Sequence, residues 1–390
     1  MKAGALPLHG PRAVVTALSA HGWEAHRAEA AAQGLGPVAL HLTDVPAAAI
    51  EALVGWNRRA ALDLLTGEDW VIIAGTRSRV GALARPWTVP AELSELAVQV
   101  GMALPAEPPS EWVTARGRVP LQDPVIIGIL NLTPDSFSDG GALGTLEAAL
   151  TNAERLLTGG ATMLDVGGES TRPGAEPVPA AAEQDRVLPV IGALASRYPG
   201  VPISIDTVKA SVAEAALAAG AWIVNDVSGL RLDPAIGGVV AAAGAGVVLM
   251  HSRGSLGELA SYDHAAYPGG VTAEVATELA GAVARATSAG IAIERMVVDP
   301  GFGFAKTASQ NLELLDGLAA LQSLARPVLV GPSRKRFLGQ ATGRDVLDRE
   351  RATAAACLLA WERGARLFRV HDPAAVRDAL MLARAVGKAG

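Results

Sequence analysis

Cysteine is almost absent from this 390-residue sequence, in which Cys357 is the single one. One thiol excludes an intrachain disulfide and a cysteine-based metal cluster. Cys357 lies within the apolar run Ala354–Ala360, and such a setting is typical of a buried helix residue rather than of a nucleophile. The sequence therefore offers no support for thiolate catalysis or thiolate metal binding.

Positive charge is also scarce. The 33 lysine and arginine residues are outnumbered by 39 acidic ones, the net charge is −6, and no basic run occurs. Nucleic acids and anionic membranes are bound by clustered cations, so neither is expected as a partner.

Long apolar runs and a secretion signal are missing as well. The start, MKAGALPLHG, lacks the basic-then-apolar pattern of a signal peptide. The longest uncharged segment, Ala235–Met250, contains four glycines, and Gly244 and Gly246 stand where a helix should end and a strand begin. We therefore expect a cytoplasmic protein with no membrane partner.

The chain divides by pattern into three parts. Residues 1–102 predict a small mixed α/β domain with a helix over 46–65, a strand over 70–74 and a loop over 75–81, and they contain no recognisable chemistry. Residues 103–124 predict a proline-rich linker (ALPAEPPS) and a candidate hairpin over 112–119, because proline resists both helix and sheet. Residues 125–390 form the third part.

In that third part, short β-branched apolar runs alternate with longer stretches of helical spacing. Eight such repeats in about 265 residues predict a (β/α)₈ barrel, with a doubly wound open sheet as the structural alternative. The predicted strands are 125–130, 163–166, 202–205, 222–224, 246–250, 296–298, 328–330 and 367–370. The predicted helices are 146–157, 181–197, 209–219, 234–243, 272–289, 310–324, 349–363 and 374–385.

Polar residues follow every one of the eight predicted strands. A single one is more often an N-cap or turn residue, but in a barrel all eight strand ends meet at one face. We therefore expect Asp206, Asn225, Asp299 and Lys335 to share a pocket. Two carboxylates, an amide and an ammonium suit a flat heterocycle with N–H donors and a carbonyl, such as a guanine- or pterin-like ring. The residues suited to an anionic group are Arg172, Lys335, Arg369 and His371.

Other catalytic motifs are incomplete. The segment GFGFAKT has Ala305 where a phosphate loop needs glycine before lysine, and GPSRKR lacks the second glycine of a nucleophile elbow. Histidines show no HExxH pairing. A metal, if used, is expected to be Mg²⁺, held by substrate phosphates and one or two oxygen ligands.

Eight segments together resemble dihydropteroate synthase. In family order they are GILNLTPDSFSDGG, LDVGGESTRPGAEPV, ISIDTVK, VNDVSGL, VVLMHSRG, VVDPGFGFAKT, GPSRKRFLG and RVHDP, which run from Gly128 to Pro373. The resemblance implies that 4-aminobenzoate is joined to 6-hydroxymethyl-7,8-dihydropterin diphosphate to give dihydropteroate and diphosphate, in a dimeric, Mg²⁺-dependent enzyme. It does not extend to residues 1–110.

The resemblance also implies roles for individual residues. Asp206, Asn225, Asp299 and Lys335 match pterin contacts. Asn131, Thr171, Arg369 and His371 match diphosphate contacts, and Asn131 also matches the magnesium ligand. Arg172, Pro173, Phe304 and Ser333 match positions near the aminobenzoate. Asp139 matches a loop carboxylate near the reacting carbon, and the residues expected to be catalytic are Asp139, Asp206, Lys335 and Arg369.

Two rival functions remain open at this point. A pterin-binding methyltransferase barrel would share the Asp206, Asn225 and Asp299 pocket without a diphosphate site, and a non-catalytic barrel would serve as a partner protein. Departures from the family pattern occur at Ser252 and Pro332 and in GSLGEL after Arg253. None of them is a residue with an assigned role.

Overall fold

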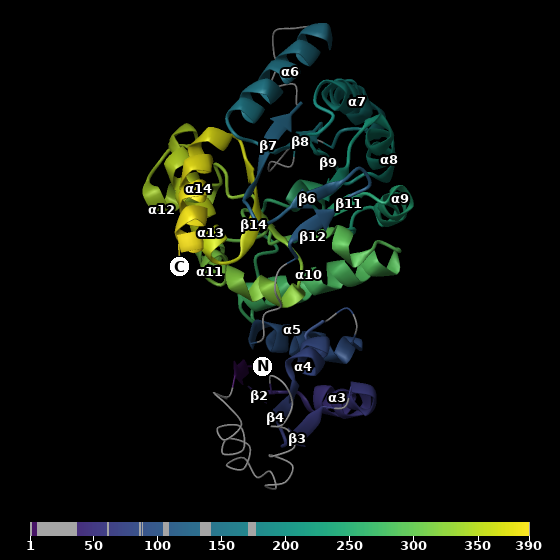
Figure 1. Cartoon of the computed structure of the whole chain (residues 1–390), viewed down its shortest axis with the longest axis vertical. Coiled ribbons are helices and arrows are strands. Elements are labelled where there is room, and N and C mark those ends of the chain that lie inside the picture. Colours follow the sequence, from purple (N-terminus) through teal and green to yellow (C-terminus); the bar gives the residue numbers. More distant parts are fainter. Residues whose placement is uncertain are drawn as a thin grey trace. The chain divides into compact units, whose positions relative to one another are not determined.

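The computed structural model describes residues 2–5, 37–60, 62–85, 87, 89–103, 109–132, 142–170 and 177–389. The chain divides into two compact units, residues 1–107 with 320–325 and residues 108–319 with 326–390. Each is described by itself, and their relative position is not determined (Figure 1).

The N-terminal unit is a small mixed α/β unit built on an antiparallel sheet with strand order β1-β2-β4-β3. Its core contains Leu40, Leu53, Ile73 and Leu96, which are fully buried. Its elements are β1 (Lys2–Ala5), β2 (Pro37–Thr43), α3 (Ala47–Ala60), β3 (Asp63–Thr66), β4 (Val71–Thr76), α4 (Arg77–Leu83), the 3₁₀ turn η2 (Ala91–Leu93) and α5 (Ser94–Ala103).

Two predictions for this unit are wrong in detail. The helix expected over 46–65 ends at Ala60, because the side chain of Asn57 bonds both backbone groups of Leu62 at 2.8 Å and turns the chain into β3. The loop expected over 75–81 is mostly helix α4, since Val80 and Leu83 are spaced to bury one face in the core.

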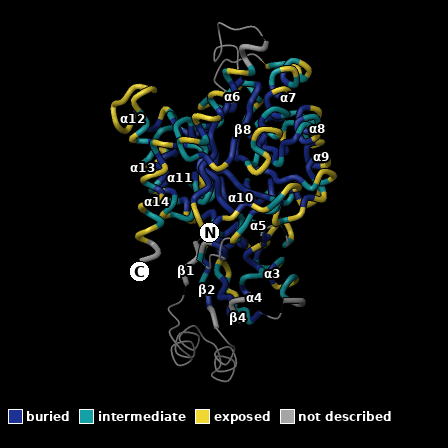
Figure 2. The backbone as a smooth tube through the Cα atoms, turned by 45° about the horizontal axis from the view of Figure 1, so that its top comes forward, coloured by how far each residue is buried: buried dark blue, intermediate teal, exposed yellow. Residues whose placement is uncertain are grey.

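The second unit is a closed barrel of eight parallel strands, so the barrel prediction is confirmed and the open sheet is excluded. In Figure 1 the helices lie outside the ring of strands, and Figure 2 shows β8 fully buried at the centre. The strands are β7 (Val125–Asn131), β8 (Met163–Gly167), β9 (Ile203–Asp206), β10 (Ile223–Asp226), β11 (Gly246–Met250), β12 (Met296–Asp299), β13 (Val328–Val330) and β14 (Ala365–Val370).

The helices follow the strands in order. They are α6 (Ala142–Thr158), α7 (Ala180–Arg197), α8 (Ala210–Ala219), α9 (Ala235–Ala243), α10 (Val271–Ser288), α11 (Ala308–Asp316), α12 (Arg336–Thr342), α13 (Glu350–Glu362) and α14 (Pro373–Ala389). The stretch predicted as one helix over 310–324 is α11 followed by a 3₁₀ segment, with Gly317 between them, and the short helix α12 was not predicted. The 3₁₀ turns are η4 (Leu256–Glu258), η5 (Ile293–Arg295), η6 (Leu318–Leu324) and η7 (Val346–Asp348).

A hairpin of β5 (Glu111–Val113) and β6 (Arg118–Pro120) closes the amino-terminal end of the barrel. Trp112 of β5 is fully buried against the first residues of β10 and β11, and its indole N–H donates to the carbonyl of Arg295 at 2.8 Å. With one end filled by this side chain, a ligand has to enter from the opposite end.

Candidate active site

A pocket of about 930 Å³ opens at the carboxyl ends of the barrel strands. We call it the barrel pocket. The residues that line it come from the ends of several different strands, which is how a barrel of this class presents its site. Of the residues singled out from the sequence, those that line it are Asn131, Asp206, Phe304, Ser333, Lys335, Arg369 and His371.

Asn225 and Asp299 are buried but do not line the barrel pocket. Asn225 lines a much smaller cavity inside the barrel, together with Asp165 and Ser204. Arg369 lines both cavities and so lies at the boundary between them. The structure thus brings Asp206 and Lys335 together and places Asn225 one layer deeper.

Arg369, on β14, holds two carboxylates across the barrel. Its Nε donates to Asp165 at 2.6 Å and its Nη2 donates to Asp206 at 2.8 Å. Asp165 in turn accepts hydrogen bonds from Ser204 at 2.5 Å and from Asn225 at 3.4 Å. Burial disfavours the charged guanidinium, but the neighbouring carboxylates outweigh it and raise the pKa of Arg369.

The two predicted carboxylates have raised pKa values. Burial raises the pKa of Asp206 to about 7, and the negative charge of Asp165 adds to this while Arg369 opposes it. Burial raises the pKa of Asp299 to about 6, although its Oδ1 accepts a hydrogen bond from the backbone N–H of Gly301 at 2.7 Å. Both groups therefore change protonation near neutral pH, which is common at functional sites.

Lys335 lies against the ring of Phe304, with its Nζ 3.9 Å from the ring centroid. Burial lowers the pKa of Lys335 to about 8, and the charge of Arg369 contributes to this lowering. Gly303, at φ +79°, permits the contact because a Cβ there would lie 2.7 Å from Cδ of Lys335. The ammonium and the aromatic ring therefore form one wall of the barrel pocket.

Ser333 and His371 are neighbours on the adjacent loops after β13 and β14. The Oγ of Ser333 lies 3.0 Å from Nδ1 of His371, and it accepts the backbone N–H of His371 at 3.2 Å. Ser333, expected near the aminobenzoate, and His371, expected at the diphosphate, thus contact each other directly.

Asn131, the last residue of β7, is suited to contribute to a magnesium site. A Cβ built at Gly167 would lie 3.7 Å from Oδ1 of Asn131 and 3.8 Å from a carboxylate oxygen of Asp206, so both oxygens border the same space. Among the described residues, no three or more His, Cys, Asp or Glu side chains are grouped as a metal site. This donor set fits an ion such as Mg²⁺, which takes few protein oxygens and relies on substrate phosphates.

Asp139, Thr171, Arg172 and Pro173 lie outside the described residues. The departures noted in the sequence do not reach the barrel pocket: Ser252 is buried and its hydroxyl donates to the carbonyl of Val227 at 2.7 Å, and Pro332 is buried without lining it.

Sequence reasoning did not assign Asp165 to the site. A signal was present, since Asp165 is the one charged residue in the otherwise apolar strand MLDVG. Lys209 is a second case: its Nζ lies 2.8 Å from Glu169, a residue of the barrel pocket, and 2.5 Å from the fully buried Glu183. A buried carboxylate requires such partners, which spacing along the chain cannot reveal.

Comparison with known proteins places this barrel in a class. Residues 127–371 match the family model described as pterin binding enzyme.

Several similar relatives carry a more specific name than this family model. The dihydropteroate synthase of Synechocystis is 43% identical over 265 residues, which are 67% of this chain and 89% of that protein. The Mycobacterium leprae dihydropteroate synthase is 45% identical, covering 68% of this chain and 94% of its own. The Xanthomonas albilineans dihydropteroate synthase with 4-aminobenzoic acid superposes with a TM-score of 0.66 at 45% identity, covering 71% and 98%. The chain belongs to the dihydropteroate synthase family.

Proposed function

We propose that this protein condenses 6-hydroxymethyl-7,8-dihydropterin diphosphate with 4-aminobenzoate to give 7,8-dihydropteroate and diphosphate. Family membership supports the reaction, and one solved relative from Xanthomonas albilineans is a complex with 7,8-dihydropteroate. The observation that carries the proposal is the gathering of Asp206, Lys335 and Arg369 around one pocket at the barrel mouth.

The pterin ring is held by Asp206, Asn225, Asp299 and Lys335. Arg369 lines both cavities and lies between the barrel pocket and Asn225, where it bonds Asp165 and Asp206. The diphosphate contacts are Asn131, Thr171, Arg369 and His371. The aminobenzoate contacts are Arg172, Pro173, Phe304 and Ser333.

In the reaction, the bond between the pterin methylene carbon and the diphosphate oxygen breaks, and the electron pair leaves with the diphosphate. Mg²⁺ bound at Asn131 would neutralise charge on the leaving group. Positive charge develops at the methylene and spreads over the ring, where Asp206 and Asp299 stabilise it, as Asp139 would from its loop. The arylamine nitrogen then forms the new bond with its lone pair, and the proton that it loses passes to water.

No covalent enzyme intermediate is required, which agrees with the burial of Cys357 in α13. The rival reading as a methyltransferase barrel requires methyl transfer from a reduced folate, with no diphosphate released.

The test is to mix the purified protein with both substrates and Mg²⁺ and to measure diphosphate release. We expect release only when both substrates are present, and a loss of at least ~100-fold in Lys335→Ala, because the variant loses the ammonium contact that binds and orients the pterin ring. Arg197→Gln, which removes an exposed ion pair with Glu154, is the matched control with unchanged rate. Absence of diphosphate, or unaltered turnover in Lys335→Ala, would contradict the proposal.

We further propose a homodimer, supported by exposed apolar side chains on α13 and α14: Leu359, Met381, Leu382 and Val386. No helix in the described residues is long and apolar enough to cross a membrane. A cytoplasmic location and the lack of a nucleic-acid partner stay predictions from the sequence.

A further inference from the structure

Lys306 is a buried cation to which the proposed reaction gives no role. It belongs to the segment 300–307 after β12, which we call the Phe304 loop, and only 1% of it is exposed. Its ammonium donates to the carbonyls of Gly301 at 3.1 Å and Phe304 at 3.0 Å, and it lies 2.9 Å from Nδ1 of His251. When Lys306 is protonated, these three partners use all three of its N–H donors.

The contact with His251 extends to α10. Burial, together with the charge of Lys306, lowers the pKa of His251 to about 4, so the ring is neutral at pH 7. Its Nδ1 then accepts from Lys306, and its Nε2–H donates to Glu278 at 3.0 Å. Burial of Glu278 opposes ionisation, but hydrogen bonds from His251 and Arg253 lower its pKa to about 2. The result is a continuous chain from Lys306 through His251 to an ionised carboxylate.

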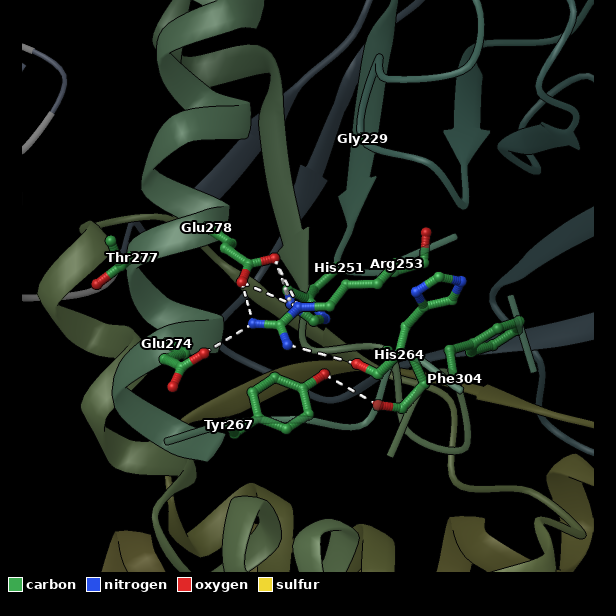
Figure 3. A network of polar contacts seen from close by, with 12 residues as sticks. Gly229, His251, Arg253, His264, Tyr267, Glu274, Thr277, Glu278 and Phe304 are labelled. Atoms are coloured by element: carbon green, nitrogen blue, oxygen red, sulfur yellow. Dashed lines mark hydrogen bonds and ion pairs between the residues drawn. The ribbon is translucent and has the colours of Figure 1, made fainter. Parts of the chain in front are cut away.

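Figure 3 shows the same carboxylate held by Arg253, which also binds Glu274 at 2.8 Å. Arg253 packs over the ring of Tyr267 at 4.0 Å, and the hydroxyl of Tyr267 donates to the carbonyl of Ala305 at 3.0 Å. The network therefore returns to the Phe304 loop from a second direction.

The Phe304 loop has a backbone that needs this support. Ala305 adopts φ +46°, a left-handed conformation that is unfavourable for a residue with a Cβ. Its N–H donates to the carbonyl of Leu259 at 2.9 Å, and the N–H of Gly303 donates to Asn311 at 2.7 Å. The loop is thus fixed around the buried ammonium, with the Phe304 ring in the pocket wall under Lys335.

We infer that Lys306, acting through His251 and Glu278, is a positioning residue that holds the Phe304 ring where it contacts the arylamine substrate and the Lys335 ammonium. The charges that face Lys306 from the neighbouring elements are Asp299 and Glu278, which favour its protonated form, and Arg253 and Lys335, which disfavour it. Burial is the largest effect and lowers the pKa of Lys306 to about 7. This inference rests on the proposed function.

The test is Lys306→Met, which keeps the length of the side chain and removes its donors. We expect the KM for 4-aminobenzoate to rise about tenfold, while the KM for the pterin diphosphate changes less than about twofold, because Phe304 is a proposed aminobenzoate contact. Glu278→Gln keeps an acceptor for His251 and removes the charge, so we expect a smaller rise, about threefold, in the same KM. If Lys306→Met does not fold, the KM for 4-aminobenzoate measured in Glu278→Gln tests the inference instead.

Arg197→Gln serves again as the surface control, with both KM values unchanged. Equal rises in both KM values, or no rise in either variant, would overturn the inference while native turnover upholds the proposed function. A native enzyme that releases no diphosphate would overturn the proposed function and the inference with it.

Discussion

The three internal lysines show how single residues define this site. The sequence has only five lysines, and Lys209, Lys306 and Lys335 each meet a buried carboxylate, a histidine or an aromatic ring. For Lys209, burial is outweighed by hydrogen bonds from its ammonium to Glu169 and Glu183, so its pKa is raised. For Lys306 and Lys335, burial prevails and the pKa is lowered. The charge that each lysine carries near neutral pH therefore depends on its environment.

Activity should depend on pH through Asp206 and Lys335. With a pKa of about 7, Asp206 becomes protonated as the pH falls and loses the charge that stabilises the cation. With a pKa of about 8, Lys335 loses its proton as the pH rises. We expect kcat/KM for the pterin substrate to be highest between these values and to fall on both sides. In Lys335→Arg the alkaline fall should move to higher pH, because a guanidinium stays charged. A flat profile from pH 6 to 9 would contradict both assignments.

At the scale of elements, the two ends of the barrel have separate tasks. The carboxyl ends carry the barrel pocket, and the amino ends are packed around the β5–β6 hairpin. Trp112 of the hairpin packs there in a cluster with Ile127, Met163 and Ile223. The closed end contributes stability and leaves the chemistry to the open one.

Replacing Trp112 with alanine should therefore destabilise the barrel by about 3–5 kcal/mol, the usual cost of removing a large buried aromatic side chain. Trp112→Phe, which keeps most of the ring and loses the bond to Arg295, should cost about 1–2 kcal/mol. Chemical unfolding measures both. KM values in the folded variants should stay near native, and a selective loss of substrate binding would count against the separation of tasks.

At the scale of the whole molecule, the chain joins a family barrel to the N-terminal unit, which has its own core. The compared relatives cover about two thirds of this chain and around nine tenths of their own length, so the matched part is the barrel. Three roles are considered for residues 1–107: oligomerisation or stability, partner binding, and a second enzymatic activity.

Removal of residues 1–107 should leave diphosphate release within about threefold of native, because every described residue of the barrel pocket lies in the second unit. The truncated chain keeps the β5–β6 hairpin, whose bond from Leu121 N–H to the carbonyl of Ser110 closes its base. A folded but inactive truncated chain would show that the N-terminal unit contributes to catalysis.

The proposed dimer predicts that Leu382→Glu yields a monomer, because a buried, unpaired carboxylate is costly at an apolar interface. Sedimentation velocity would measure the change. Val54→Glu introduces the same charge at another exposed apolar position, on α3, and should leave the oligomeric state unchanged. A native protein that sediments as a monomer would contradict the dimer.

The sequence by itself determined the barrel and the region of its site. Alternation of apolar runs with helical spacing is a local pattern, and polar residues at strand ends must converge once the strands close into a barrel. That reasoning placed Asp206 and Lys335 in one pocket. It also predicted that Gly244 ends a helix, where the structure has a left-handed C-cap.

Only the tertiary structure decided how these residues are paired. Arg369 contacts Asp165 over 204 positions of sequence, and Lys306 contacts His251 over 55. Contacts between residues so far apart along the chain produce no repeating pattern in the sequence. Whether a buried lysine or arginine is charged depends on neighbouring side chains that other strands contribute. The sequence could therefore identify Asp206 and Lys335 at the pocket, whereas the separate position of Asn225, the protonation of Lys306 and the role of Asp165 follow from burial and contact, which exist only after the chain has folded.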